Sequence, residues 1–163
     1  MRNATFSAKF LAVSTALLAV VVFVPVQPAA ANENATVPLE KSEAWPSIKK
    51  NVFGDRDVIV DTKGEVLEMY LSARADDASS VPVIVRARNA QRQDDYIKQI
   101  WLIVDKNPSP MAGVFRYSPA SGLANLETRI RVEDFTHVRA VAERSNGKLY
   151  MAGKWIISIR IKK

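Results

Sequence analysis

From residue 55 onward, the sequence consists of short segments in which apolar and polar residues alternate. Successive side chains of a β-strand point to opposite faces, so a period of two predicts strands with one buried face. In residues 81–88, for example, Val81, Val83 and Val85 share one face. No helical periodicity is sustained after Gly54, which places the fold in the all-β class.

The spacing of these segments predicts how the strands are arranged. About eight to nine short strands are separated by turns roughly every 8–12 residues, as in an immunoglobulin-like antiparallel β-sandwich. Asn146-Gly147 predicts a tight hairpin turn between two of them. The expected strands are 58–60, 66–71, 81–88, 97–105, 113–117, 126–132, 137–143, 148–151 and 155–162.

One short N-terminal helix is expected within residues 42–54, ahead of the strands. Trp45, Ile48 and Val52 recur close to helical spacing. Pro46 is tolerated in the first turn of a helix, and Gly54 is a natural stop.

The first 31 residues have the features of a secretory signal. Arg2 and Lys9 precede an apolar stretch whose uninterrupted core, residues 16–24, is shorter than the roughly 20 residues that span a bilayer. Ala29-Ala30-Ala31 fits the cleavage rule. We therefore expect a cleaved signal at 1–31, a flexible lead-in at 32–41, one domain at 42–163, and export to the periplasm. An uncleaved membrane anchor is the alternative.

Composition excludes several classes of protein. The 163 residues contain no cysteine and one histidine, which excludes disulfides, thiolate sites and multi-histidine metal centres. Removal of the signal takes away two basic residues and no acid, so the formal charge falls from +6 to +4. An exported chain with this charge and no nucleic-acid motif is not expected to bind nucleic acid, nor a membrane once the signal is removed.

The sequence contains no recognisable catalytic constellation. His137 would be the only imidazole for a Ser-His-Asp triad, and no serine lies in a nucleophile-elbow context. We interpret His137 as an ordinary surface or half-buried residue. No motif for a cofactor or a metal ion is found, so the chain is not expected to be an enzyme.

Two groups of residues are candidates for binding. Arg129, Arg131 and Arg139 would form a basic patch for an acidic partner or a small oxyanion if their strands converge, and a solvated sheet face is the alternative. The last strand is apolar on one face, and a free edge there would pair with another chain. Internal pairing with a buried tryptophan agrees equally well with the pattern. The candidate partner-binding residues of this strand are Trp155, Ile157, Ile159 and Ile161.

A set of segments spread from residue 45 to about 161 carries a family resemblance. Their order and spacing resemble those of SoxY, the sulfur-carrier subunit of periplasmic thiosulfate oxidation. Residues 138–151 are especially similar to the SoxYZ-like carriers encoded beside quinoprotein alcohol dehydrogenases. The segments are Trp45, Phe53-Gly54-Asp55-Arg56, and residues 73–77, 81–83, 103–110, 115, 128–132, 136–143 and 146–150.

The resemblance implies an immunoglobulin-like sandwich, a periplasmic location and a SoxZ-type partner in a hetero-oligomer. In the family, the last strand runs into a Gly-Gly-Cys arm whose thiolate carries sulfur intermediates covalently. The present chain has no cysteine and stops at Lys163, about where that arm would begin. Carriage as a persulfide or thiosulfonate needs a sulfur nucleophile, so the resemblance extends to the fold and not to the carrier chemistry.

These observations predict a periplasmic, non-catalytic SoxY-like binding or scaffold subunit that cannot itself carry sulfur covalently. It would serve sulfur-compound oxidation or a quinoprotein dehydrogenase system, with a SoxZ-like protein or a periplasmic redox protein as partner. Two alternatives remain open, a truncated remnant of a thiosulfate-oxidation carrier and a small-oxyanion binder.

Overall fold

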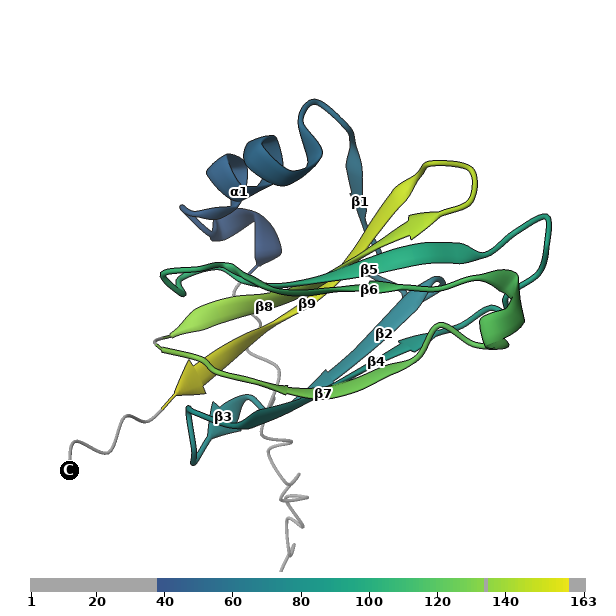
Figure 1. Ribbon diagram of the computed structural model, residues 1–163. Coiled ribbons are helices and arrows are strands. Elements are labelled where there is room, and N and C mark those ends of the chain that lie inside the picture. The colour runs from purple at the N-terminus through teal and green to yellow at the C-terminus, as the bar shows by residue number, and fades with distance from the viewer. Residues whose placement is uncertain (1–37, 134, 159–163) are drawn as a thin grey trace, which may run out of the picture. The chain divides into compact units, whose positions relative to one another are not determined.

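The structure, a computed structural model, describes residues 38–133 and 135–158. Their strands form two sheets packed face to face (Figure 1), which confirms the predicted all-β sandwich. The larger sheet has the order β1 (Val58–Val60), β9 (Leu149–Ser158), β8 (Thr136–Arg144), β5 (Ile97–Val104) and β6 (Met111–Arg116), with β3 (Arg74–Ala75) also beside β9. The smaller sheet has the order β2 (Leu67–Leu71), β4 (Val81–Ala87) and β7 (Leu126–Ile130).

Most expected strands are observed within two residues of their predicted ends. Three features differ from the prediction. The two runs 148–151 and 155–162 belong to one strand, β9, over its described length, and β3 is too short to leave a pattern in the sequence. The sandwich is also not purely antiparallel, because β1 and β3 both pair with β9 in parallel.

The main core lies between the two sheets, and β4 shows how the alternating pattern builds it. Val81, Val83 and Val85 are at most 1% exposed, whereas Pro82 and Arg86 on the opposite face are exposed and Ile84 is half-buried. The valines pack into a cluster with inward-facing residues of β5 and β8. Full burial of each such side chain stabilises the fold by about 1.5–3 kcal/mol.

A second core lies on the outer face of the larger sheet, under the helix α1 (Trp45–Phe53). Proline in the first turn and Gly54 at the C-terminal end, with φ of 64°, bound this helix as predicted. Trp45, Ile48 and Phe53 are its buried side chains. They pack against strands β5, β8 and β9, so the central strands of this sheet are covered on both faces.

Part of the expected lead-in is attached to the sheet. Of residues 32–41 the structure describes 38–41, in which Leu39–Lys41 form the 3-10 helix η1. Arg139 Nη2 donates to the Leu39 carbonyl over 2.8 Å. The Leu39 side chain packs so closely on Gly153 that a Cβ there would lie 2.6 Å from Leu39 Cδ2. The expected signal at 1–31 lies outside the described residues.

Candidate functional site

Strand β9 carries the predicted partner-binding residues. Trp155 and Ile157 are half-buried on it, and Ile159 and Ile161 lie outside the described residues. Trp155 lies opposite His137 of β8, with the ring centroids 4.8 Å apart in an edge-to-face contact. His137 is only 2% exposed. The interpretation of His137 as a surface or half-buried residue is therefore wrong, because β8 is covered on both faces.

The described part of β9 has a strand on both sides only at residues 149–151. It pairs with β8 over residues 149–156. On its other side it pairs with β1 over residues 149–151 and with β3 over residues 157–158. Internal pairing is observed along one side of β9 up to residue 156, but among the described residues 152–156 have no neighbouring strand on the other side, and Trp155 is half-buried rather than part of the core.

Two of the three arginines of the predicted basic patch lie at the edge of the smaller sheet. Arg129 is an exposed residue of β7, and its Nη1 donates to the Ser80 carbonyl over 3.0 Å. Arg131 follows β7, and its Nε lies 3.0 Å from Glu133 Oε1. Each guanidinium therefore already has a local acceptor.

Arg139 belongs to a different region. It lies on β8 in the larger sheet and is 0% exposed, so the prediction that it shares a surface patch with Arg129 and Arg131 is wrong. The alternation that suggested a polar face is real, since Val138 and Ala140 point into the main core. The opposite face, however, is covered by α1 and η1 rather than by solvent.

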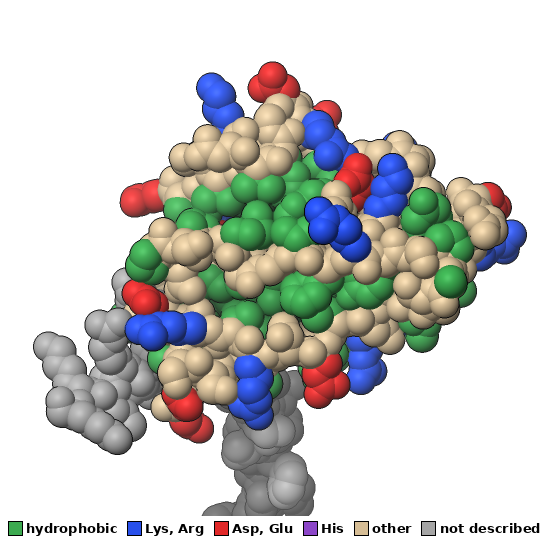
Figure 2. Space-filling view, viewed as in Figure 1, with side chains coloured by type: hydrophobic (Ala, Val, Ile, Leu, Met, Phe, Trp, Pro, Cys, Tyr) green, Lys and Arg blue, Asp and Glu red, His purple; other side chains and the backbone are tan. Residues whose placement is uncertain are grey.

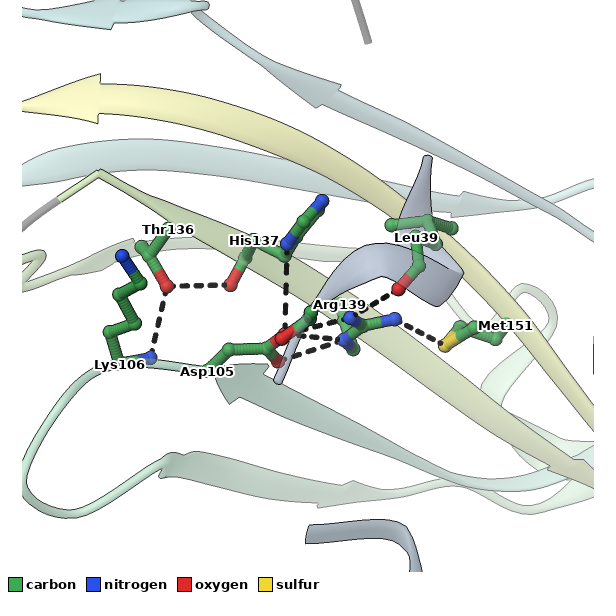
Figure 3. A network of polar contacts seen from close by, with 8 residues as sticks. Leu39, Asp105, Lys106, Thr136, His137, Arg139 and Met151 are labelled. Carbon is green, nitrogen blue, oxygen red and sulfur yellow. Dashed lines mark hydrogen bonds and ion pairs between the residues drawn. The ribbon is translucent and has the colours of Figure 1, made fainter. Parts of the chain in front are cut away.

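Arg139 is the centre of a buried polar network (Figure 3). Its Nε lies 2.8 Å from Asp105 Oδ1 and its Nη2 lies 2.7 Å from Asp105 Oδ2. The guanidinium also stacks over the Trp45 ring, with Cζ 4.3 Å from the centroid. The Asp105 carboxylate accepts a further hydrogen bond from the Ser42 hydroxyl, and His137 Nδ1 lies 3.8 Å from its Oδ2.

The network connects the N-terminal part of the domain to the larger sheet. Arg139 binds the Leu39 carbonyl of η1 and the Trp45 ring of α1, while Asp105 binds Ser42 between them. Buried charges of this kind are tolerated only when they are paired and hydrogen-bonded. Because all these partners are internal, we interpret the network as a clamp that holds η1 and α1 in place.

A cavity of about 530 Å³ opens beside β9. Gly153 and Trp155 form one wall, and the turn that carries Asp61 and Lys63 forms another. In residues 38–133 and 135–158, no group of three or more acidic or histidine side chains could hold a metal ion. Asp61 lines this cavity and was not among the residues predicted from the sequence.

Asp61 organises the turn between β1 and β2. Its carboxylate accepts hydrogen bonds from the backbone N–H groups of Glu65, Val66 and Leu67, over 2.7–2.9 Å. Burial raises the pKa of Asp61, but these N–H groups together with that of Gly64 hold the pKa below its ordinary value. Asp61 is thus ionised at neutral pH and structural, which is the opposite of a carboxyl adapted to general acid chemistry.

Comparisons with known proteins address the family of this domain. The family model described as sulfur oxidation protein SoxY matches residues 49–159, more than half of the chain. No curated protein matches this chain.

Solved structures with a similar fold include two kinds of protein. The sulfur carrier protein SoxY from Chlorobium limicola f thiosulfatophilum is 20% identical over 70% of this chain and 90% of that chain, with a TM-score of 0.56. A superoxide reductase (neelaredoxin) from Ignicoccus hospitalis is 13% identical over 63% of this chain and 94% of that chain, with a TM-score of 0.55. At these identities the likeness shows a shared fold and not a shared chemistry.

The match of the family model spans the second half of α1 and all nine described strands, and it agrees with the resemblance noted in the sequence and with the sandwich that this resemblance implies. The chain belongs to the SoxY family.

Proposed function

We propose that this chain is a periplasmic, non-catalytic SoxY-type subunit that binds another protein and does not itself carry sulfur covalently. The observation that supports this most strongly is a SoxY-type domain within 163 residues that contain no cysteine. A persulfide or thiosulfonate carrier needs a thiolate, and no hydroxyl or amine can replace it. The subunit would serve either the oxidation of sulfur compounds or a quinoprotein dehydrogenase.

The edge strand β6 supports a binding role. Its only neighbour among the described strands is β5, so one row of backbone groups is open. Val114 is 39% exposed, and Met111 and Phe115 are partly buried. On the face that carries β6, Figure 2 shows two bands of hydrophobic side chains separated by backbone and uncharged polar side chains. An edge flanked by apolar side chains is suited to pairing with a strand of another protein.

A SoxZ-like chain is the partner that we propose for this edge, in a hetero-oligomer. A periplasmic redox protein is the alternative. Arg129 and Arg131 would meet acidic groups at the rim of the interface. Trp155 and Ile157 lie on β9, which β8 and β5 separate from β6, and remain proposed contacts of a second surface. A small-oxyanion site gains no support, because Arg139 is buried against Asp105.

The proposed location rests on the signal-like segment at 1–31 and on the family. Within the described part of the chain, no helix has the length and apolar character needed to cross a membrane. N-terminal sequencing of the protein from a periplasmic extract tests the location, with Asn32 expected as the first residue. Recovery of the intact first 31 residues would contradict it.

The binding role is tested with the SoxZ-like and periplasmic redox proteins encoded beside this chain. Size-exclusion chromatography with light scattering should show a heterodimer with one of them. Val114→Arg should abolish it by placing a charge in the interface, and Val114→Thr should retain it as the matched control. A chain that stays monomeric with every such protein would refute the proposal.

The non-carrier role has a separate test. The purified chain, treated with thiosulfate and an oxidant, should gain no sulfur adduct in mass spectrometry, beyond the oxygen atoms that its methionines take up. A covalent sulfur adduct that dithiothreitol removes would show that the chain carries sulfur after all.

A further inference from the structure

One edge of strand β9 is open along its middle. At one end of this edge, the Asp61 N–H donates to the Met151 carbonyl over 2.9 Å, and at the other end the Ile157 N–H donates to the Ala73 carbonyl over 2.9 Å. Between these two points, no strand of the described chain pairs with residues 152–156 on this side. We call this opening between β1 and β3 (Figure 1) the β9 gap.

The backbone of β9 presents both donors and acceptors to the β9 gap. The N–H and C=O of one strand residue point to the same side, and the side alternates from residue to residue. Since Met151 and Ile157 bond toward this edge, the N–H and C=O of Gly153 and Trp155 also face it. Another peptide backbone matches this alternation, whereas a small anion would meet the carbonyl oxygens as well as the N–H groups.

The space beside these groups is large enough for an extended peptide. The cavity of about 530 Å³ runs along residues 151–155 of β9, with Leu67 and Met69 of the edge strand β2 on another side. Its volume lies within the roughly 300–1,000 Å³ of ligand-binding pockets. The open residues 152–156 correspond to about 17 Å of strand, so an occupant needs about five extended residues.

Lys154 places a positive charge in this cavity. It lines the cavity and is half-buried, on the face of β9 that also carries Ala152 and Ile156 of the main core. Within residues 38–133 and 135–158, no ion pair or hydrogen bond engages the Lys154 ammonium. A partly buried charge of this kind is stabilised by a carboxylate partner.

The two acidic residues that line the same cavity already have partners. Asp61 accepts hydrogen bonds from three backbone N–H groups of the turn that follows it. Glu68 accepts hydrogen bonds from the Arg88 guanidinium and the Tyr70 hydroxyl. The negative charge that Lys154 lacks therefore has to come from the occupant of the cavity.

We propose that the β9 gap binds an extended acidic peptide segment of another protein. The segment pairs with the backbone groups of Gly153 and Trp155 and places a carboxylate beside Lys154. Directly opposite residues share a face of the sheet, so the acidic residue lies opposite Lys154. Its two neighbours point to the other face, where Trp155 and Leu39 offer apolar contacts.

The expected recognition sequence is thus an acidic residue between two apolar residues. The β9 gap and the edge strand β6 lie on opposite sides of the larger sheet, with β8 and β5 between them. One partner can therefore pair with β6 while a second protein occupies the gap. The inference concerns β9 alone and holds whether or not the proposed function is correct.

Titration of the purified chain with a synthetic peptide, followed by the NMR signals of its amides, tests the proposal. The probe is acetyl-Thr-Val-Glu-Val-Thr-amide, and the same peptide with Gln in place of Glu is the matched control. The amides of Gly153 and Trp155 should shift, and the Glu peptide should bind at least about tenfold more tightly than the Gln peptide. Lys154→Met should reduce this preference below about twofold, and Lys154→Arg should keep it.

Methylation of single peptide nitrogens tests whether the probe pairs as a strand. The N–H groups of adjacent strand residues point to opposite sides, so only one of the Glu nitrogen and the preceding Val nitrogen can donate toward β9. Methylation of that nitrogen should weaken binding at least about tenfold, and methylation of the other by less than about twofold. The Val85 amide, in the main core, serves as the unaffected reference.

Three results would overturn the proposal. The first is the absence of shifts at Gly153 and Trp155 at millimolar peptide, or shifts confined to β6, which would show that the gap takes no peptide. The second is equal binding of the Glu and Gln peptides, or an equal response to the two methylations. The third is slow hydrogen exchange of the Gly153 and Trp155 amides before peptide is added, which would show that the gap is already filled, by a second copy of the chain if the protection rises with protein concentration.

Discussion

Replacement of Arg139 by methionine should destabilise the domain more than any surface substitution. Methionine retains much of the volume and removes the guanidinium from its place beside Asp105, where both side chains are at most 1% exposed. Breaking a buried ion pair from one side costs about 3–5 kcal/mol. Loss of the donor to the Leu39 carbonyl adds about 1 kcal/mol. For a domain of this size, the sum corresponds to a Tm lower by roughly 15–25 °C.

Urea denaturation at pH 7 measures the change in the free energy of unfolding. A matched series separates pairing from packing. Arg139→Lys keeps the charge and loses the two-pronged contact, so its loss should be smaller. The double variant Arg139→Met/Asp105→Leu removes both charges and should recover most of the stability lost in either single variant.

Hydrogen exchange gives the local readout of the same change. The Lys41 amide donates to the Pro38 carbonyl within η1, and it should lose protection in Arg139→Met because η1 is no longer held. An Arg139→Met protein within about 1 kcal/mol of the unsubstituted chain, or a double variant no more stable than the single ones, would refute the clamp.

Three further predictions concern other parts of the domain. The folded-state pKa of Asp61 is lowered, so the ionised carboxylate stabilises the fold above about pH 4, and this stabilisation is lost as the pH falls through that pKa. In urea denaturation, Asp61→Asn should therefore reduce the loss of stability at acid pH. An unchanged loss would argue against this role of Asp61. Gly153→Val should lower the free energy of unfolding by about 1–3 kcal/mol, because the new side chain meets Leu39. Adding Leu39→Ala should partly restore the stability in thermal unfolding, and no recovery would show that the clash is with another residue. In the same assay, Phe53→Ala should lower the free energy of unfolding by about 3–5 kcal/mol. Val52→Ala, at a position 36% exposed, should change it by less than about 0.5 kcal/mol. Equal losses would show that α1 does not pack through Phe53.

The sequence predicted the elements whose cause is local. Alternation in β4 and the helical spacing around Trp45 follow from residues close together in the chain, and both elements were observed at the expected places. The Asn146-Gly147 turn likewise needs only a glycine that accepts a positive φ, which is 82° here. These elements can be predicted because they depend only on the spacing of apolar residues and on local backbone conformation.

The errors arise where burial depends on distant segments. Arg139 alternates with apolar residues as an exposed cation would, yet α1 and η1 cover it from nearly 100 positions earlier in the chain. His137, on the same strand, is buried beside Trp155 and Asp105, which come from two other parts of the chain. The neighbours of β9 were also unpredictable, because β3 has two residues and no pattern. The alternation of residues along a strand does not indicate which face of the sheet a helix will cover.

The position of β9 has a consequence for the order of folding. This strand pairs with β1 and β3, so Val58 meets Leu149 and Arg74 meets Ile157, partners from opposite halves of the chain. Contacts of such long sequence separation must overcome a large loop-closure entropy and slow folding to roughly milliseconds or longer. The larger sheet therefore cannot close before Leu149–Ser158 has been synthesised. A topology of this kind keeps the growing chain unfolded until its last strand has been made, and its apolar segments remain exposed for that time.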